Sequence, residues 1–89
     1  MTILLHKSFK KSFRTRVTVN KKLLAQVIRR IELFQDRPNS AQLKDHALSG
    51  ELKGKRAFSV SGDMRIIYEV LAADTCVFLD IGTHAQVYK

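Results

Sequence analysis

The chain has 89 residues, of which 45% are hydrophobic and 27% charged, with 4 Gly and 1 Pro. This length and composition predict one compact domain over residues 1–89 and exclude a collagen, a coiled rod or a disordered chain. No apolar stretch reaches the roughly 20 residues that cross a bilayer, and the single cysteine, Cys76, offers neither an internal disulfide nor a CxxC metal site. We therefore expect a cytoplasmic protein with no membrane partner, metal or cofactor.

The net charge of +8 comes from 16 Lys and Arg against 8 Asp and Glu. Ten of the cations but only two of the acids lie in residues 1–37, whereas residues 38–89 hold six of each. The first half therefore carries the whole net charge, which attracts polyanions. A nucleic acid, an acidic protein or an anionic membrane would each bind such a field, and a solvated basic surface without a partner is the alternative.

A strand and a short helix open the chain. The aliphatic run TILLH at 2–6 predicts a strand. Ser8 can cap a following helix, in which Phe9 and Phe13 share one face because they are four residues apart.

A second helix is predicted from Asn20, whose side chain can accept a hydrogen bond from an unpaired backbone N–H. Its apolar residues keep a 3.6-residue period, and it stops at Arg37 because Pro38 disfavours helix in the residue before it. The two helices form a hairpin with a basic outside. An ordered loop without regular structure is expected over 39–50.

The apolar period changes to two over residues 55–71, KRAFSVSGDMRIIYEVL, which predicts a β-hairpin with Ser61 and Gly62 at its turn. The nearly continuous apolar run TCVFLDI at 75–81 predicts a third, central strand. The expected fold class is α+β, a small antiparallel sheet in the order β-α-α-β-β-β, with the helical hairpin packed on one face.

Strand alternation assigns side chains to the two faces of this sheet. The set expected under the helices is Met64, Ile66, Tyr68 and Val70. Asp63, Arg65 and Glu69 would then project from the opposite face. We expect that open face to be polar and ionisable.

Two histidines are candidates for proton transfer, His46 in the loop before the hairpin and His84 after the last strand. The two could meet in the fold, and a pair of imidazoles beside an arginine and a carboxylate could cleave RNA: the 2′-hydroxyl loses a proton, the 5′-oxygen gains one, and a cation stabilises the phosphorane. Histidine titrates near about pH 6.5, so one ring can start neutral and the other charged. His6, at the end of the first strand, is expected to be structural.

The second half resembles a known toxin superfamily. Its segments KDHALSGELKGKRAFSVSGDMRIIYEV and DIGTHAQVY are similar to the C-terminal half of the RelE superfamily of bacterial type II toxins, nearest to its YafQ-like branch. The shared pattern is a KDH, a Leu and a Gly, a GxR entering a strand, an Asp, an IY pair, and a GTH with an aromatic residue four positions on. The matching residues are Lys44, Asp45, His46, Leu48, Gly50, Gly54, Arg56, Asp63, Ile67, Tyr68, Gly82, Thr83, His84 and Tyr88.

This resemblance implies a RelE/ParE-like fold and a ribosome-dependent mRNA endonuclease that acts without metal. It places His46, Asp63, His84 and Tyr88 on catalytic or substrate-binding positions of the YafQ-like branch. Arg65 matches a position where other RelE relatives have a phosphate-contacting arginine. His84 is then the expected general acid, and His46 the base, oriented by hydrogen bonding or by Asp63.

Partners also follow from the resemblance and the charge. A cognate antitoxin would hold the toxin inactive in a toxin–antitoxin hetero-oligomer, and the ribosome and mRNA would be its targets. Arg56, in the GxR, is expected either to contact RNA or to form an ion pair. The cations expected to dock on ribosomal RNA are Lys10, Lys11, Arg14, Lys21 and Lys22.

The sequence departs from the YafQ-type pattern at two strand positions, where Ala57 and Ser59 replace an Asp and a His. One proton-transfer partner is therefore missing, so either Arg65 takes over transition-state stabilisation or activity is altered. Each site residue also has a structural alternative: Asp63 as a turn residue, Arg65 in an ion pair with Glu69 or Asp80, and Tyr88 as a terminal hydrophobic residue.

Two other functions remain open. A ParE-like relative on the same fold would inhibit gyrase by binding, since a fold does not fix function. An RNA-binding module whose catalytic set has decayed would explain Ala57 and Ser59. The GTH histidine favours the nuclease, because binding alone has no evident use for it.

Overall fold

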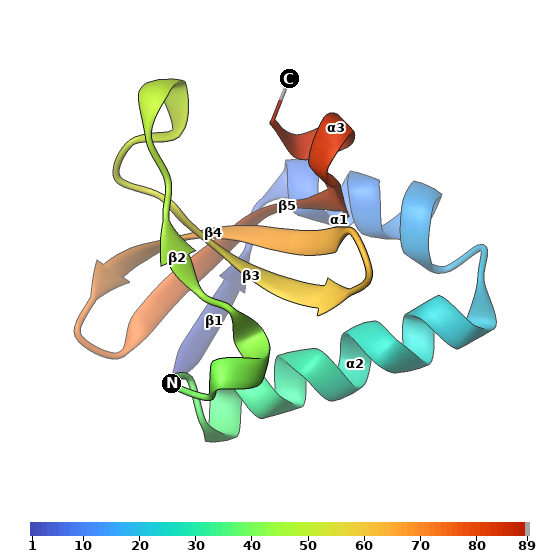
Figure 1. The fold of residues 1–89 in the computed structure, drawn as a ribbon, viewed down its shortest axis with the longest axis horizontal. Helices are drawn as coiled ribbons and strands as arrows, with labels where there is room; N and C mark the ends of the chain where they lie inside the picture. The colour runs from blue at the N-terminus through green and yellow to red at the C-terminus, as the bar shows by residue number, and fades with distance from the viewer. Residues whose placement is uncertain (89) are drawn as a thin grey trace.

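The computed structural model describes residues 1–88, whose elements follow one another in mixed order (Figure 1). The helices are α1 (Lys7–Ser12), which continues into a π-helical segment (Phe13–Val17), α2 (Lys21–Asp36) and α3 (His84–Val87), with 3₁₀ turns at Ala41–Leu43 and Gly50–Leu52. The strands are β1 (Thr2–Leu5), β2 (His46–Ala47), β3 (Arg56–Ser61), β4 (Met64–Ala72) and β5 (Thr75–Thr83). The helical hairpin and the three long strands confirm the expected α+β fold.

Side chains fix the start of both long helical segments. The Asn20 side chain accepts the Leu23 N–H at 3.0 Å, which confirms the predicted cap of α2. The predicted Ser8 cap is wrong, because α1 begins one residue before Ser8 and the N-cap is His6, whose Nδ1 accepts the Ser8 N–H at 3.1 Å. This contact confirms the structural role expected of His6. Ser8 instead donates its hydroxyl to the carbonyl of Leu79 in β5 at 2.7 Å.

The sheet has the order β1-β5-β4-β3-β2. β3, β4 and β5 pair antiparallel as expected, and β2 adds an antiparallel strand beside β3; β1 runs parallel to β5, so the sheet is mixed. Parallel pairing needs a long connection, and everything between the two strands, both helices included, supplies it. The two-residue strand β2 replaces part of the irregular loop expected over 39–50.

The β3–β4 turn lies one residue later than expected, at Gly62 and Asp63. Gly62 has φ +53°, which favours glycine, and Ser61 is still paired as the last residue of β3. A register shift between Ser59 and Ser61 provides the extra residue. Asp63 is therefore held at the tip of the hairpin, next to the end of β5.

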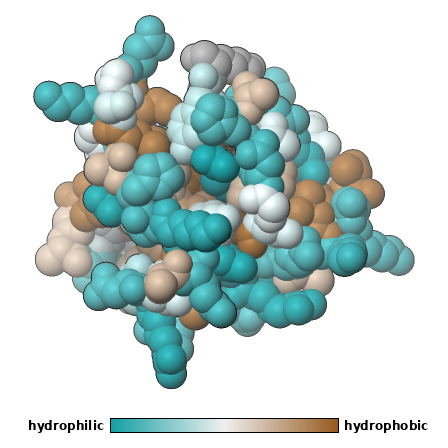
Figure 2. Space-filling model, viewed as in Figure 1, coloured by the Kyte–Doolittle hydropathy of each residue, from teal (hydrophilic) through white to brown (hydrophobic). Residues whose placement is uncertain are grey.

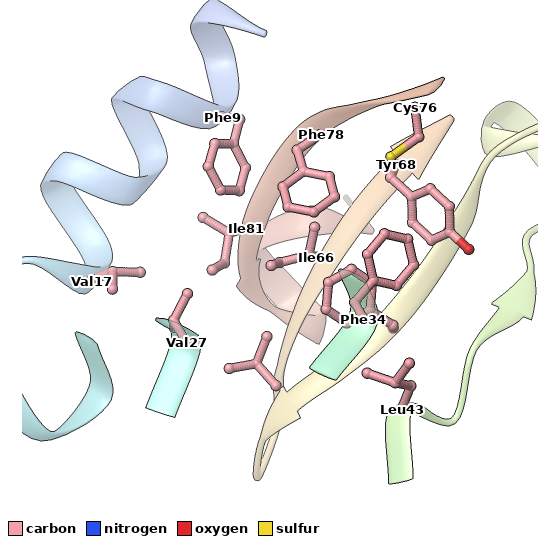
Figure 3. Packing of buried hydrophobic residues seen from close by; sticks show 12 residues of the cluster. Phe9, Val17, Val27, Phe34, Leu43, Ile66, Tyr68, Cys76, Phe78 and Ile81 are labelled. Carbon is pink, nitrogen blue, oxygen red and sulfur yellow. The ribbon is translucent and has the colours of Figure 1, made fainter. Parts of the chain in front are cut away.

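The core lies between the helices and one face of the sheet (Figure 3). The Phe34 ring of α2 stacks on Phe58 of β3, with centroids 4.5 Å apart and an interplanar angle of 8°. Buried side chains of the sheet around this pair include Val60, Ile66, Tyr68, Phe78 and Ile81.

Two expectations about the faces of β4 are wrong. Val70 is 57% exposed, because β3 begins opposite Tyr68 and leaves the far end of β4 uncovered on that side. On the opposite face, Ile67 and its β3 partner Ala57 are buried, since α3 and the 48–55 segment stand on that face (Figure 1). We call this the open face; its floor combines the buried apolar pair Ala57 and Ile67 with the polar pair Ser59 and Arg65. None of the helices within residues 1–88 combines the length and apolar character needed to cross a bilayer.

Arg16, in the π-helical segment, braces the end of β5. Its Nη1 donates to the Ile81 carbonyl at 2.9 Å and lies 3.6 Å from the carboxylate of Asp80. A Cβ on Gly82 would stand 2.6 Å from this Nη1 and 2.8 Å from Oε1 of Gln86. Gln86 in turn accepts the Thr83 N–H at 2.8 Å and caps α3. The glycine of the GTH motif therefore lets Arg16 and the first turn of α3 approach β5.

Gly82→Ala should destabilise the protein by about 1–3 kcal/mol, because the added methyl group must displace both side chains. Urea unfolding measures this loss. In an Arg16→Ala background the loss should be smaller, since one of the two obstacles is gone. An equal loss in both backgrounds would show that Arg16 does not press on Gly82.

Candidate functional site

Four of the expected site residues come together on the open face, where β4 begins and β5 ends. Arg65 of β4 pairs with Gly82 of β5, and β5 runs directly into α3, whose first residue is His84. The His84 and Tyr88 rings, one helical turn apart, meet edge to face with centroids 4.5 Å apart. The Arg65 guanidinium carbon lies 5.5 Å from the centre of the Tyr88 ring. We call Asp63, Arg65, His84 and Tyr88 the α3 cluster.

Asp63 ties the α3 cluster together through its two carboxylate oxygens. Oδ1 lies 3.2 Å from Nη2 of Arg65, and Oδ2 accepts the backbone N–H of His84 at 3.2 Å. Arg65 therefore pairs with Asp63 rather than with Glu69 or Asp80. Asp63 fixes the start of α3 relative to the β3–β4 turn, and with it the place of the His84 ring.

Tyr88 packs between a histidine and an arginine rather than standing free at the end of the chain. Its ring is partly buried, and its hydroxyl oxygen is buried without a hydrogen-bond partner among residues 1–88. An aromatic face beside an arginine and a histidine can stack on a nucleobase.

His46 lies on the same face but outside the α3 cluster. It belongs to β2 and pairs with Ala57 of β3. β2 is three strands from β5, and at about 4.8 Å per strand the backbones of β2 and β5 are about 14 Å apart across the sheet. The Nδ1 of His46 lies 3.0 Å from the carbonyl oxygen of Lys44, not beside Asp63. Because a carbonyl only accepts, Nδ1 carries the proton and the neutral ring keeps Nε2 as a proton acceptor.

The two histidines are separated by the floor of the open face. Ala57 pairs with Ile67 and Ser59 pairs with Arg65, so these residues lie in two rows across β3 and β4. Ala57 and Ser59, the two positions where the YafQ-type pattern has ionisable residues, are both in this floor. The only charged side chain in the two rows on β3 and β4 is that of Arg65.

A groove of about 560 Å³ opens beside the α3 cluster, between α3 and the 48–52 segment. Figure 2 shows mostly hydrophilic side chains over this view of the molecule, with apolar residues in separate small groups. The residues lining the groove are Leu48, Ser49, Glu51, Leu52, Asp80, Gln86, Val87 and Tyr88. Half of these residues are apolar and half polar, two of them carboxylates, so the groove can hold a small planar ligand that offers hydrogen-bond donors, such as a nucleobase.

Arg56 lies away from the α3 cluster, on the face that carries Phe58. Its Nε donates to Oδ1 of Asp45 at 2.8 Å, and Tyr68 donates to the other carboxylate oxygen. The hydrogen bond to Asp45 raises the pKa of Arg56. Of the two roles expected for Arg56, the ion pair is confirmed.

The cations of the first half are displayed on the helices. The exposed ones at the end of α1, in the π-helical segment and at the start of α2 include Lys10, Lys11, Arg14, Lys21 and Lys22.

The sequence analysis missed Arg16 and Gln86, which hold β5 and α3 in place, because their partners are distant in the chain or lie in an element that was not expected. Within residues 1–88, no group of three or more His, Cys, Asp or Glu side chains is close enough to hold a metal ion.

Comparison with known proteins identifies the family of the chain. The family model for "Bacterial toxin of type II toxin-antitoxin system, YafQ" matches residues 1–89. No match was found among curated protein sequences.

Three solved structures illustrate the likeness. YafQ from Escherichia coli strain BL21(DE3) is 24% identical, covering 98% of this chain and 97% of its own, with a TM-score of 0.77. A chain of the E. coli DinJ–YafQ toxin–antitoxin complex is 25% identical, covering 98% and 96%, with a TM-score of 0.75. The YoeB/ParE toxin from Agrobacterium tumefaciens is 14% identical, covering 94% and 99%, and its TM-score of 0.77 shows the shared fold. With a family model that spans its whole length, the chain belongs to the YafQ family of bacterial type II toxin–antitoxin toxins.

Proposed function

We propose that this toxin is a ribosome-dependent mRNA endonuclease that cleaves by attack of the 2′-hydroxyl, without metal. The observation that carries the proposal is the α3 cluster, in which a histidine, an arginine and a tyrosine are held together at the rim of the open face. His46 stands on the same face, across a floor that could carry the RNA backbone.

The scissile phosphate would lie above Ser59 and Arg65, with the imidazole rings of His46 and His84 extending over the floor from either side to reach its 2′- and 5′-oxygens. Nε2 of neutral His46 takes the 2′-hydroxyl proton, and the 2′-oxygen forms a bond to phosphorus. Protonated His84 gives its proton to the 5′-oxygen as the bond from phosphorus to that oxygen breaks. The products are a 2′,3′-cyclic phosphate and a 5′-hydroxyl. Arg65 neutralises the charge that develops on the phosphorane.

Tyr88 stacks on a base next to the scissile bond and fixes the orientation of that nucleotide. Stacking of this kind is worth about 1–3 kcal/mol per base. Arg65 has the larger share of transition-state stabilisation in this chain, because Ala57 and Ser59 provide no ionisable side chain on the floor.

The partners follow from the family and from the charge. We expect the whole chain to act as one toxin domain in the cytoplasm, where translating ribosomes are found. A cognate antitoxin would bind it in a hetero-oligomer, as DinJ binds YafQ in the E. coli complex. The exposed cations of α1 and α2 would dock on ribosomal RNA, since ten basic side chains in residues 1–37 exceed what one scissile phosphate needs.

A ParE-like gyrase inhibitor is the second candidate, because the YoeB/ParE toxin shares the fold with a TM-score of 0.77. Such an inhibitor acts by binding and does not need the His84 imidazole. Growth arrest by His84→Ala as strong as that by the wild type, with messages intact and DNA supercoiling lost, would favour this candidate.

His84→Ala should lower single-turnover mRNA cleavage on programmed ribosomes by a factor of about 10² to 10⁴, the usual contribution of one general acid. Ribosome affinity should stay within a few-fold, because proton transfer acts mainly in the transition state. The matched control is His6→Ala, which alters an exposed histidine at the start of α1 and should change the cleavage rate little. A cleavage rate equal to that of the wild type would refute the assignment of the general acid.

Replacing five exposed helix cations by Gln should weaken ribosome binding and flatten its salt dependence. Each phosphate contact contributes a slope of about 0.7–0.9 in log K against log salt. Circular dichroism should show an unchanged fold, because all five side chains are exposed. An unchanged salt slope would mean that these cations form only a solvated surface. The residues replaced are Lys10, Lys11, Arg14, Lys21 and Lys22.

A further inference from the structure

Three motif residues that the proposed chemistry leaves unused meet at one edge of the sheet. They are Asp45 of the KDH, Arg56 of the GxR and Tyr68 of the IY pair. Nε of Arg56 donates to Oδ1 of Asp45 at 2.8 Å, and the Tyr68 hydroxyl donates to Oδ2. Each carboxylate oxygen thus receives its own donor, and the Asp45 side chain is only 13% exposed.

Tyr68 joins this group to the core. Its ring packs edge to face with Phe34, with centroids 5.0 Å apart, and the residue is 4% exposed. Figure 3 shows its hydroxyl pointing away from the other aromatic rings. Burial raises the pKa of Tyr68, and the hydrogen bond to Asp45 adds to the rise, so the hydroxyl keeps its proton and remains a donor.

On one side of Asp45 the chain is anchored by Leu43, which is fully buried in the core, whereas the two residues of β2 on the other side are exposed. Lys44 has φ +49°, a left-handed conformation that is unfavourable for lysine and turns the chain after the 3₁₀ segment. β2 itself is two residues long, and one further bond, from the Leu48 N–H to the Lys55 carbonyl at 2.9 Å, extends its pairing. Such a short edge strand has few hydrogen bonds of its own to keep its register.

Asp45 directly precedes β2 and His46 is its first residue, and the two side chains lie on opposite faces of the sheet. His46 pairs with Ala57 on the open face, whereas Asp45 contacts Arg56 and Tyr68 on the face covered by the helices. Movement of one side chain would therefore carry the other with it.

We propose that Asp45 is a positioning residue that, held by Arg56 and Tyr68, fixes β2 so that the His46 imidazole faces the open side of the sheet. That Asp45 fixes β2 follows from these contacts alone. That Asp45 thereby affects cleavage rests on the proposed function. The Lys44 carbonyl, which lies 3.0 Å from Nδ1 of His46, belongs to the same fixed turn. Asp45 thereby also sets the tautomer that leaves Nε2 free.

Amide hydrogen exchange followed by NMR tests whether Asp45 fixes β2 in the full chain. Tyr68→Phe keeps the ring in the core and removes one donor, and Asp45→Asn keeps the shape of the side chain and removes its charge. Both should speed exchange of the Leu48 amide at least about tenfold and shift the His46 ring signals, while the amides that pair β4 with β5 stay protected. Asp36→Asn, at the exposed end of α2, is the matched control and should change neither.

Leu48 exchange and His46 signals that match the wild type in Tyr68→Phe would overturn the proposal, even if Asp45→Asn failed to fold. Faster exchange throughout the sheet would also overturn it, because that pattern indicates a general loss of stability rather than a local hold on β2.

Single-turnover cleavage tests the consequence. Asp45→Asn should slow cleavage about tenfold or more with ribosome affinity unchanged, and in a His46→Ala background it should cause no further loss. An equal loss in both backgrounds would mean that Asp45 does not act through His46. If the wild type cut no mRNA at all, the proposed function would fail, and the exchange experiment would still decide whether Asp45 holds β2.

Discussion

The packing of α2 on the sheet, centred on the Phe34 ring stacked on Phe58, is the interaction on which the rest of the structure depends. Because side chains alternate along a strand, burying Phe58, Ile66 and Tyr68 under the helices sends Ser59, Arg65 and Ile67 to the other face. The helices therefore determine which residues line the open face. The same packing leaves the cations of the helices on the outside, exposed to solvent.

Side-chain contacts at the two ends of the open face, and not only its strands, determine where its histidines lie. At one end Asp63, Arg16 and Gln86 fix the start of α3 and so place His84 and Tyr88. At the other end Asp45 is bound from the helix side and places His46. Both histidines are thus held by neighbours with ordinary ion pairs and hydrogen bonds, and Arg65 is the charged side chain in the rows of β3 and β4 between them.

Much of the fold could be predicted because its signals are local. The 3.6-residue period after Asn20 and the two-residue period through β3 and β4 each reflect burial of one side of one element, and both elements are present. The motifs of the second half identified the family. The ion pair of Arg56 was one of two roles that the sequence left open.

The parts that could not be predicted depend on contacts between distant segments. β2 and α3 have two and four residues, too short to show a period, and the direction of β1 is set by its neighbour β5. The spacing of His46 and His84 depends on strand order, which sequence alone does not give. The β3–β4 turn moved by one residue because a bulge in β3 leaves no mark in its alternating pattern.

The central claim is that the open face cleaves RNA by attack of the 2′-hydroxyl. Its most direct test is an mRNA on programmed ribosomes in which the nucleotide on the 5′ side of the cleaved bond carries 2′-deoxyribose. The account predicts that this message is bound with normal affinity and stays intact, whereas the all-ribose message yields a 2′,3′-cyclic phosphate and a 5′-hydroxyl. Cleavage of the deoxy-substituted message at the same bond and rate would contradict the account.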